Sequence, residues 1–241
     1  MRYYILIGTV AAVMAAWSCG WFYKAGQLRE EIQQRASQSS QAREWAYRGM
    51  TITGFPFRLQ VDLNSPRVAL RGQKREIFWT TDQIKAVGHP WQPHHILFDL
   101  TGRHQFKTGP AGQKRELTLD SSEAMASVET DADNRPERLS LDIKEIALRH
   151  NGDPALRGER LQLHSRPTPG MPDGLDLAVN GKALEVAEGA LPFNIVALPR
   201  TAKLVDLQAT VTGLPEGGIT LGGLPQWRDG GGTLEIKKLR L

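Results

Sequence analysis

The stretch "ITGFPFRLQVDLNSPRV", residues 52–68, decides the fold class of this chain. Between residues 55 and 63 every second residue is apolar, and the residues between them are polar or turn-forming. This period of two is typical of a strand with one apolar face and one solvated face. The pattern therefore predicts a strand over 55–63 whose apolar face consists of five side chains: Phe55, Phe57, Leu59, Val61 and Leu63.

The same alternation returns along most of the chain, between turn clusters rich in Gly and Pro. No long helical pattern intervenes, so consecutive strands should pair antiparallel, with one helical turn expected near 81–87. We therefore expect a mainly β fold built on an antiparallel, curved or sandwich-like sheet. The further strands are predicted at 47–53, 66–71, 76–81, 94–100, 114–120, 124–130, 138–149, 159–165, 174–180, 182–187, 203–212 and 233–241.

Two octapeptides, "LDIKEIAL" (141–148) and "LEIKKLRL" (234–241), match by residue type and share one irregularity. In each, the apolar alternation skips a residue at the charged pair and resumes in the opposite phase. A β-bulge or a one-sided turn would do this, keeping one face apolar while bending the strand. Residues 59–70 contain a longer version of this pattern, in which residues 64–66 break the phase of the alternation. The bend is the firmer expectation. The similarity between the two octapeptides can come from internal duplication or from chance.

The N-terminus carries no charged residue between Arg2 and Lys24. A helix of that length crosses a hydrocarbon core of about 30 Å, and aromatic residues at both ends are typical of membrane interfaces. These features favour an uncleaved signal anchor over a cleaved signal peptide or lipid attachment at Cys19, the only cysteine. The anchor residues are expected to be Tyr4, Ile5, Leu6, Ile7, Val10, Val13, Trp17, Trp21 and Phe22.

The chain accordingly divides into a transmembrane anchor at 1–23, a helical stalk at 24–45 and a β-rich domain at 46–241. The stalk, with Leu28, Ile32, Arg35 and Ala36 on one stripe, is expected to lift the domain off the bilayer. Because the alternation runs to the last residue, either an edge strand closes the domain there or the natural protein continues past Leu241, and we favour the second.

No pattern in the sequence indicates chemistry. The net charge of +4 is scattered, without a basic block, so nucleic acid is not an expected partner. Four of the six histidines lie within 89–104, but the adjacent His94 and His95 would point to opposite faces of a strand. Nucleophile elbows and phosphate loops are missing. We expect no catalytic residue, metal or cofactor, and we do not expect an enzyme.

Several segments in a fixed order carry a family resemblance: an apolar segment ending in Trp and Tyr, a charged stalk, "GFPFRL" (54–59), "WQPHHILFDL" (91–100) and "GGTLEIKKLRL" (231–241). In this order they resemble the uncharacterised bacterial family called domain of unknown function 2125. The resemblance implies an inner-membrane anchor, a β-rich part in the periplasm and no known reaction. A looser similarity in architecture is to AsmA-type envelope proteins. The motif residues are Gly54, Phe55, Pro56, Phe57, Arg58, Trp91 and Pro93.

Two functions follow from an anchored protein with one-sided strands. The apolar face could bind lipid or another apolar component of the cell envelope. The alternative is a structural or assembly protein of the envelope that engages a protein partner through an edge strand or the stalk. If two sheets instead pack into a closed sandwich, every apolar face is already covered. The shape of the sheet therefore separates an open apolar face from a closed core.

Overall fold

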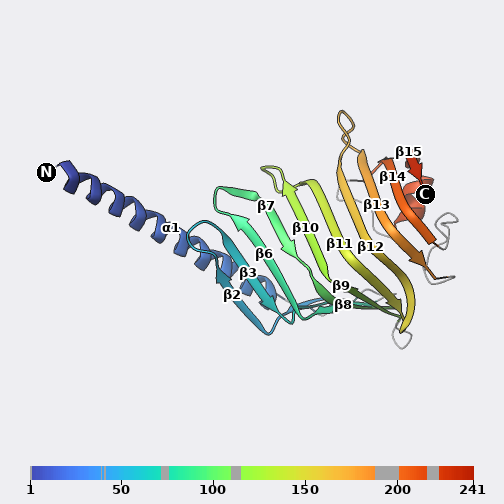
Figure 1. Ribbon diagram of the computed structural model, residues 1–241, viewed down its shortest axis with the longest axis horizontal. Helices are drawn as coiled ribbons and strands as arrows, with labels where there is room; N and C mark the ends of the chain where they lie inside the picture. Colours follow the sequence, from blue (N-terminus) through green and yellow to red (C-terminus); the bar gives the residue numbers. More distant parts are fainter. Residues whose placement is uncertain are drawn as a thin grey trace.

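The computed structural model describes residues 2–38, 40, 42–71, 76–109, 115–187, 201–215 and 223–241. A long helix, α1 (Arg2–Ser37), leads into an antiparallel β-sheet that curls into a half-barrel (Figure 1). The N-terminal part of α1 projects away from the sheet, and a short helix, α2 (Leu224–Asp229), lies near the C-terminus. This confirms the mainly β fold class, with a curved sheet after an N-terminal helix.

The sheet contains fifteen strands within the described residues. They are β1 (Arg43–Ala46), β2 (Gly49–Thr53), β3 (Leu59–Asn64), β4 (Arg67–Arg71), β5 (Glu76–Thr81), β6 (Gln83–His89), β7 (Gln92–Asp99), β8 (Gly102–Gly109), β9 (Arg115–Ser121), β10 (Glu123–Thr130), β11 (Pro136–His150), β12 (Asp153–Pro167), β13 (Leu175–Val186), β14 (Thr201–Thr212) and β15 (Thr233–Arg240).

Many consecutive strands are the two halves of a single run of the chain across the sheet, which a short break divides. Only Asp82 separates β5 from β6, and only Ser122 separates β9 from β10. One set of halves pairs in the order β2-β3-β6-β7-β10, and the other in the order β1-β4-β5-β8-β9. The long strand β11 joins them, because its first part pairs with β10 and its last part with β9. The sheet is therefore bent along a crease that crosses the strands at these breaks.

The crease depends on the phase skip that the sequence predicts at 141–148. Ile143 and Ile146 lie three residues apart, yet both are only 5% exposed and belong to one cluster with Ala124. In a regular strand such residues would face opposite sides. Glu145 between them has φ 49°, and this turn of the backbone brings both isoleucines to the inner side of the bend. The expected bend in this octapeptide is confirmed.

A residue with positive φ also bends the chain at two other places along the crease. Ser65, between β3 and β4, has φ 48° and Ala183 in β13 has φ 50°. The proline that follows Ser65, Pro66, is fully buried, so the predicted phase break at 64–66 is also a bend toward the core. Leu119 and Leu161 pack on the Ala124 cluster from different strands, which places the core on the inside of the crease.

The second octapeptide bends in a different way. Gln208 and Ala209 of β14 pair with Lys238 and Ile236 of β15, so two residues oppose three and the register shifts. This is a β-bulge with one extra residue. The bulge turns two adjacent lysines to the outer side, where Lys237 approaches Asp176 and Lys238 pairs with Asp206.

Several local predictions differ from the structure. The helical turn expected at 81–87 is wrong, because these residues form the end of β5 and most of β6. The crease at Asp82 places Thr81 and Ile84 on one face, and this spacing of three imitates a helix. The strands expected at 174–180 and 182–187 form the single strand β13, whose bend at Ala183 resembles a break in the sequence. The elements β1, β8 and α2 were not predicted from the sequence.

The helix α1 is continuous from the apolar segment into the expected stalk. It ends at Ser37, and residues 43–45 belong to β1 rather than to a helix. Trp21 and Ala25 are buried. Partly or fully buried side chains recur at helical spacing along one stripe, so the second half of α1 packs against the domain. The stripe consists of Ser18, Trp21, Ala25, Leu28, Ile32 and Ala36.

Candidate functional site

One row of side chains crosses the sheet from β2 to β15 and is apolar at every position. Each residue is the register partner of the next, so all lie on the same face of the sheet. We call this face, on the inside of the crease, the inner face. The row is Ile52, Val61, Ala86, Phe98, Ala126, Leu141, Leu163, Val179, Leu207 and Leu239.

The neighbouring row lies on the opposite, outer face and is almost entirely polar. It contains Thr51, Asp62, Lys85, Asp99, Met125, Asp142, Gln162, Asn180, Asp206 and Arg240. Ion pairs run across it, with 3.4 Å between Lys85 Nζ and Asp99 Oδ2. A hydrogen bond from Arg160 holds the pKa of Asp142 below its ordinary value. The two faces therefore differ in chemistry: the outer face is charged and polar, and the inner face is apolar.

The inner face is filled at the crease and open toward its rim. At the crease the Ala124, Ile143 and Ile146 side chains are buried. Away from it, Leu139 on the same strand is 47% exposed, and Ile96, Leu163 and Leu239 are also exposed. The described residues thus leave apolar surface uncovered at the rim. A contiguous apolar surface of this kind can bind an acyl chain or another apolar group.

The residues predicted to form the apolar sheet face divide into two groups. Leu59, Val61 and Leu63 lie on β3 and belong to the inner face. Phe55 and Phe57 do not extend it, because residues 55–57 form the turn between β2 and β3. This turn closes with a hydrogen bond of 3.0 Å from the Arg58 amide to the Gly54 carbonyl.

The turn at 54–58 packs against the middle of α1. The Trp17 indole Nε1 donates to the Pro56 carbonyl at 3.0 Å, and the Trp21 Nε1 donates to the Arg58 carbonyl at 2.9 Å. The Phe55 ring lies 5.6 Å from the Trp21 ring, measured between centroids. Two hydrogen bonds and an aromatic contact therefore hold the turn on the helix.

Glycine is required at the start of this turn. Gly54 has φ +102°, which side-chain-bearing residues rarely adopt. A Cβ there would also lie 2.7 Å from the Arg58 carbonyl oxygen. The Phe55–Pro56 peptide bond that follows is cis. Glycine thus allows the backbone to bring the two carbonyls of the turn to the indoles of α1.

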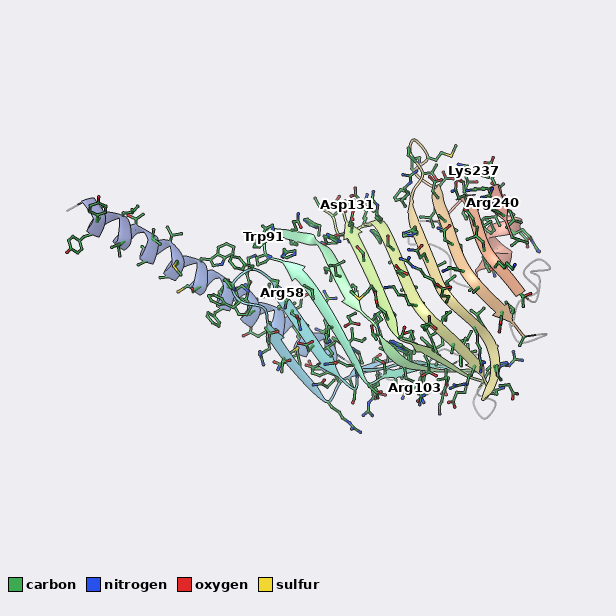
Figure 2. All side chains as sticks on the ribbon, in the orientation of Figure 1. Arg58, Trp91, Arg103, Asp131, Lys237 and Arg240 are labelled. Carbon is green, nitrogen blue, oxygen red and sulfur yellow. The ribbon has the colours of Figure 1, made fainter. Side chains whose placement is uncertain are left out.

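A second turn, between β6 and β7, reaches the same part of α1. The Trp91 ring lies 6.2 Å from the Trp17 ring and stacks on the His89 ring at 5.1 Å. The His89 Nδ1 lies 3.1 Å from the Phe57 carbonyl oxygen, which joins the two turns. We call the set the aromatic collar; it consists of Trp17, Trp21, Phe22, Phe55, Phe57, His89 and Trp91. Figure 2 shows Trp91 and Arg58 at the end of the sheet where α1 leaves it.

The aromatic collar brings together motif residues that are far apart in the sequence. The 54–58 segment and Trp91 meet on α1, whereas Pro93 lies in strand β7. Sequence reasoning missed this convergence. Its signal was the presence of large aromatic side chains, Phe57 and Trp91, in turns that otherwise favour polar residues.

Most of the predicted anchor residues lie on the part of α1 that projects from the domain. The helix Tyr3–Ser37 is long and apolar enough to span a membrane, with a mean hydropathy of 1.8 over its most apolar 18 residues, and it is the one such helix in the described residues. Of the nine predicted residues, Trp21 is buried against the domain. The other eight are exposed: Tyr4, Ile5, Leu6, Ile7, Val10, Val13, Trp17 and Phe22.

The histidine cluster is dispersed. His94 Nδ1 faces Thr130 Oγ1 at 3.4 Å, and His95 Nε2 faces Ser127 Oγ at 2.9 Å. His104 lies at the crease, with Nε2 2.6 Å from the Leu100 carbonyl. Within the described ranges, no three His, Cys, Asp or Glu side chains come close enough to hold a metal ion.

A shallow hollow of about 450 Å³ lies over the outer side of β11 to β15. Its acidic residue, Asp176, accepts hydrogen bonds from Thr210 at 2.9 Å and Thr168 at 3.1 Å. Arg166 and Lys237 form ion pairs with it. The hydrogen bond from Thr210, first among these interactions, lowers the pKa of Asp176. Because this carboxylate already has its partners, the hollow contains a structural network.

Comparison with known proteins gives one match. Neither a curated protein nor a solved structure matches the chain. The model of a bacterial family of uncharacterised proteins matches residues 21–241, a range that includes Trp21, the 54–58 turn and Trp91. The chain therefore belongs to DUF2125, a family of uncharacterised proteins conserved in bacteria.

Proposed function

We propose that this protein is anchored in the bacterial inner membrane by α1 and binds lipid, or another apolar component of the cell envelope, on its inner face. The observation that carries the proposal is the unbroken apolar row from Ile52 to Leu239, which is exposed at the rim. The bulk of the chain then lies in the periplasm. Alkaline phosphatase fused after Leu241 tests this orientation, because it is active only when exported.

The energetics favour an acyl ligand. Covering apolar surface gains about 0.8 kcal/mol per buried methylene, so ten methylenes laid along the rim gain on the order of 8 kcal/mol before ordering costs. The outer face offers no comparable gain, because its side chains are polar and already paired with one another. A ligand with a long hydrocarbon chain therefore belongs on the inner face.

The test compares two adjacent residues of β12. A photo-crosslinking benzoylphenylalanine replaces Leu163, on the inner face, or Gln162, on the outer face, in intact cells. After irradiation and purification, mass spectrometry should detect a lipid adduct at position 163 and none at position 162. Equal adducts at both positions, or none at position 163, would refute lipid binding by the inner face.

A specific feature also favours the alternative function, a structural or assembly protein of the envelope. Within the described residues β15 pairs only with β14, and all of its residues are exposed. A strand of a partner protein could pair with its other edge. Benzoylphenylalanine at Lys238 would then give an adduct of protein size. Lipid-sized adducts at position 163 together with no protein-sized adduct at position 238 would argue against this function.

A further inference from the structure

The aromatic collar contains side chains that the domain does not cover. Phe57 is 68% exposed and Trp91 is 53% exposed, whereas Trp21 at the centre of the collar is 5% exposed. Trp17 and Phe22 on α1 are also exposed. Large aromatic side chains from two turns and a helix thus form one exposed patch, and such patches mark interaction sites.

The position of the collar along α1 indicates what covers it. A hydrocarbon core of about 30 Å is crossed by about 20 helical residues. A span that begins at Tyr3 therefore reaches the second interface near Phe22, just before Lys24, the first charged residue after Arg2. The turns contact Trp17, Trp21 and Phe22, so they lie at the same level as this interface.

The composition of the patch suits that level. Tyr and Trp are enriched at both membrane–water interfaces, where their amphipathic rings lie among the headgroups. Lys24 and Arg58, both exposed beside the collar, can approach lipid phosphates. Elsewhere, the outer face of the sheet presents charged and polar rows that would lose hydration in the same place.

We propose that the turns at 54–58 and 89–91 enter the membrane interface beside α1, with Phe57 and Trp91 among the lipid headgroups and upper acyl chains. This inference rests on the anchoring part of the proposed function and does not require lipid on the inner face. The aromatic collar then fixes which end of the sheet rests on the bilayer: the end that carries β2, β3, β6 and β7, drawn nearest to the projecting part of α1 in Figure 1.

The test measures membrane depth in the full chain. Cys19 is the only cysteine, so a Cys19→Ser background accepts one new cysteine at a time, labelled with the fluorophore NBD. The labelled positions are Phe57→Cys and Trp91→Cys in the collar, Val10→Cys in the helix and Asp153→Cys at an exposed strand start. Each protein is reconstituted into phosphatidylcholine–phosphatidylglycerol vesicles that contain a doxyl-labelled quenching lipid.

The expected result is at least a twofold loss of NBD fluorescence at positions 57 and 91, with blue-shifted emission, and no loss at position 153. Position 10 should be quenched most by a lipid labelled deep in the acyl chain. Quenching at position 10, with positions 57 and 91 no more quenched than position 153, would overturn the collar proposal alone. Absence of quenching at positions 10, 57 and 91 would overturn the anchoring as well.

Discussion

The crease core can be tested with one matched pair of substitutions in β11, Ile146→Ala and Leu139→Ala. Both side chains lie on the inner face, but Ile146 is 5% exposed and Leu139 is 47% exposed. Truncating Ile146 removes three buried carbons at about 0.8 kcal/mol each and leaves a cavity, which gives a loss of about 3–4 kcal/mol. Leu139 loses about half of the transfer free energy and leaves no cavity, so about 1 kcal/mol is expected.

The assay is urea unfolding of the full chain in detergent micelles, followed by circular dichroism of the strand signal. The free energy of unfolding is obtained by linear extrapolation, and an unchanged slope with urea shows that the denatured state is comparable. A loss at Ile146→Ala no larger than that at Leu139→Ala would refute the reasoning. It would mean that the crease is not the stabilising centre of the sheet.

Three further predictions concern other parts of the molecule. Gly181→Ala should destabilise the crease by about 1–3 kcal/mol, because its Cβ would lie 2.4 Å from Leu184 Cδ1; adding Leu184→Ala should recover part of this loss in the same urea assay. Thr210→Val should raise the pKa of Asp176 toward its ordinary 3.8 in a ¹³C NMR titration. Since the folded-state pKa is lowered, the stability from Asp176 is complete above that value and is lost as pH falls through the folded pKa; the variant should lose part of it near neutral pH. Trp21→Ala should speed amide hydrogen exchange at 54–58 but not at 131–135. An equal increase in the exchange rate of both segments would contradict docking of the turn by α1.

The alternation in the sequence predicted the sheet well because period-two patterning reports directly which face is apolar. Leu59, Val61 and Leu63 lie on the predicted face for this reason. Phe55 and Phe57 continue the same alternation but lie in a turn. The alternation could not predict this, because it carries no information about the hydrogen bond to the Gly54 carbonyl that closes the turn. The apolar surroundings of Phe55 are provided by α1 and not by the sheet, whereas the Phe57 side chain is exposed.

The crease explains most of the remaining errors. A bend that keeps two residues three apart on one face resembles helical spacing, as at 81–87, or a break between strands, as at Ala183. The aromatic collar was beyond sequence reasoning because it needs Trp17, the 54–58 turn and Trp91 to meet. Their sequence separation gives no periodic signal, and only the register of β2, β3, β6 and β7 places the two turns side by side.

The clamp between α1 and the 54–58 turn limits the reach of this protein. A helix hydrogen-bonded through two indoles to the domain it carries leaves no slack between them, so the domain cannot swing out on a flexible tether. Once the helix is in a bilayer, the sheet can reach no farther from that membrane than the length of the sheet itself. If α1 spans a membrane as proposed, a component bound on the inner face would stay within one sheet length of that membrane.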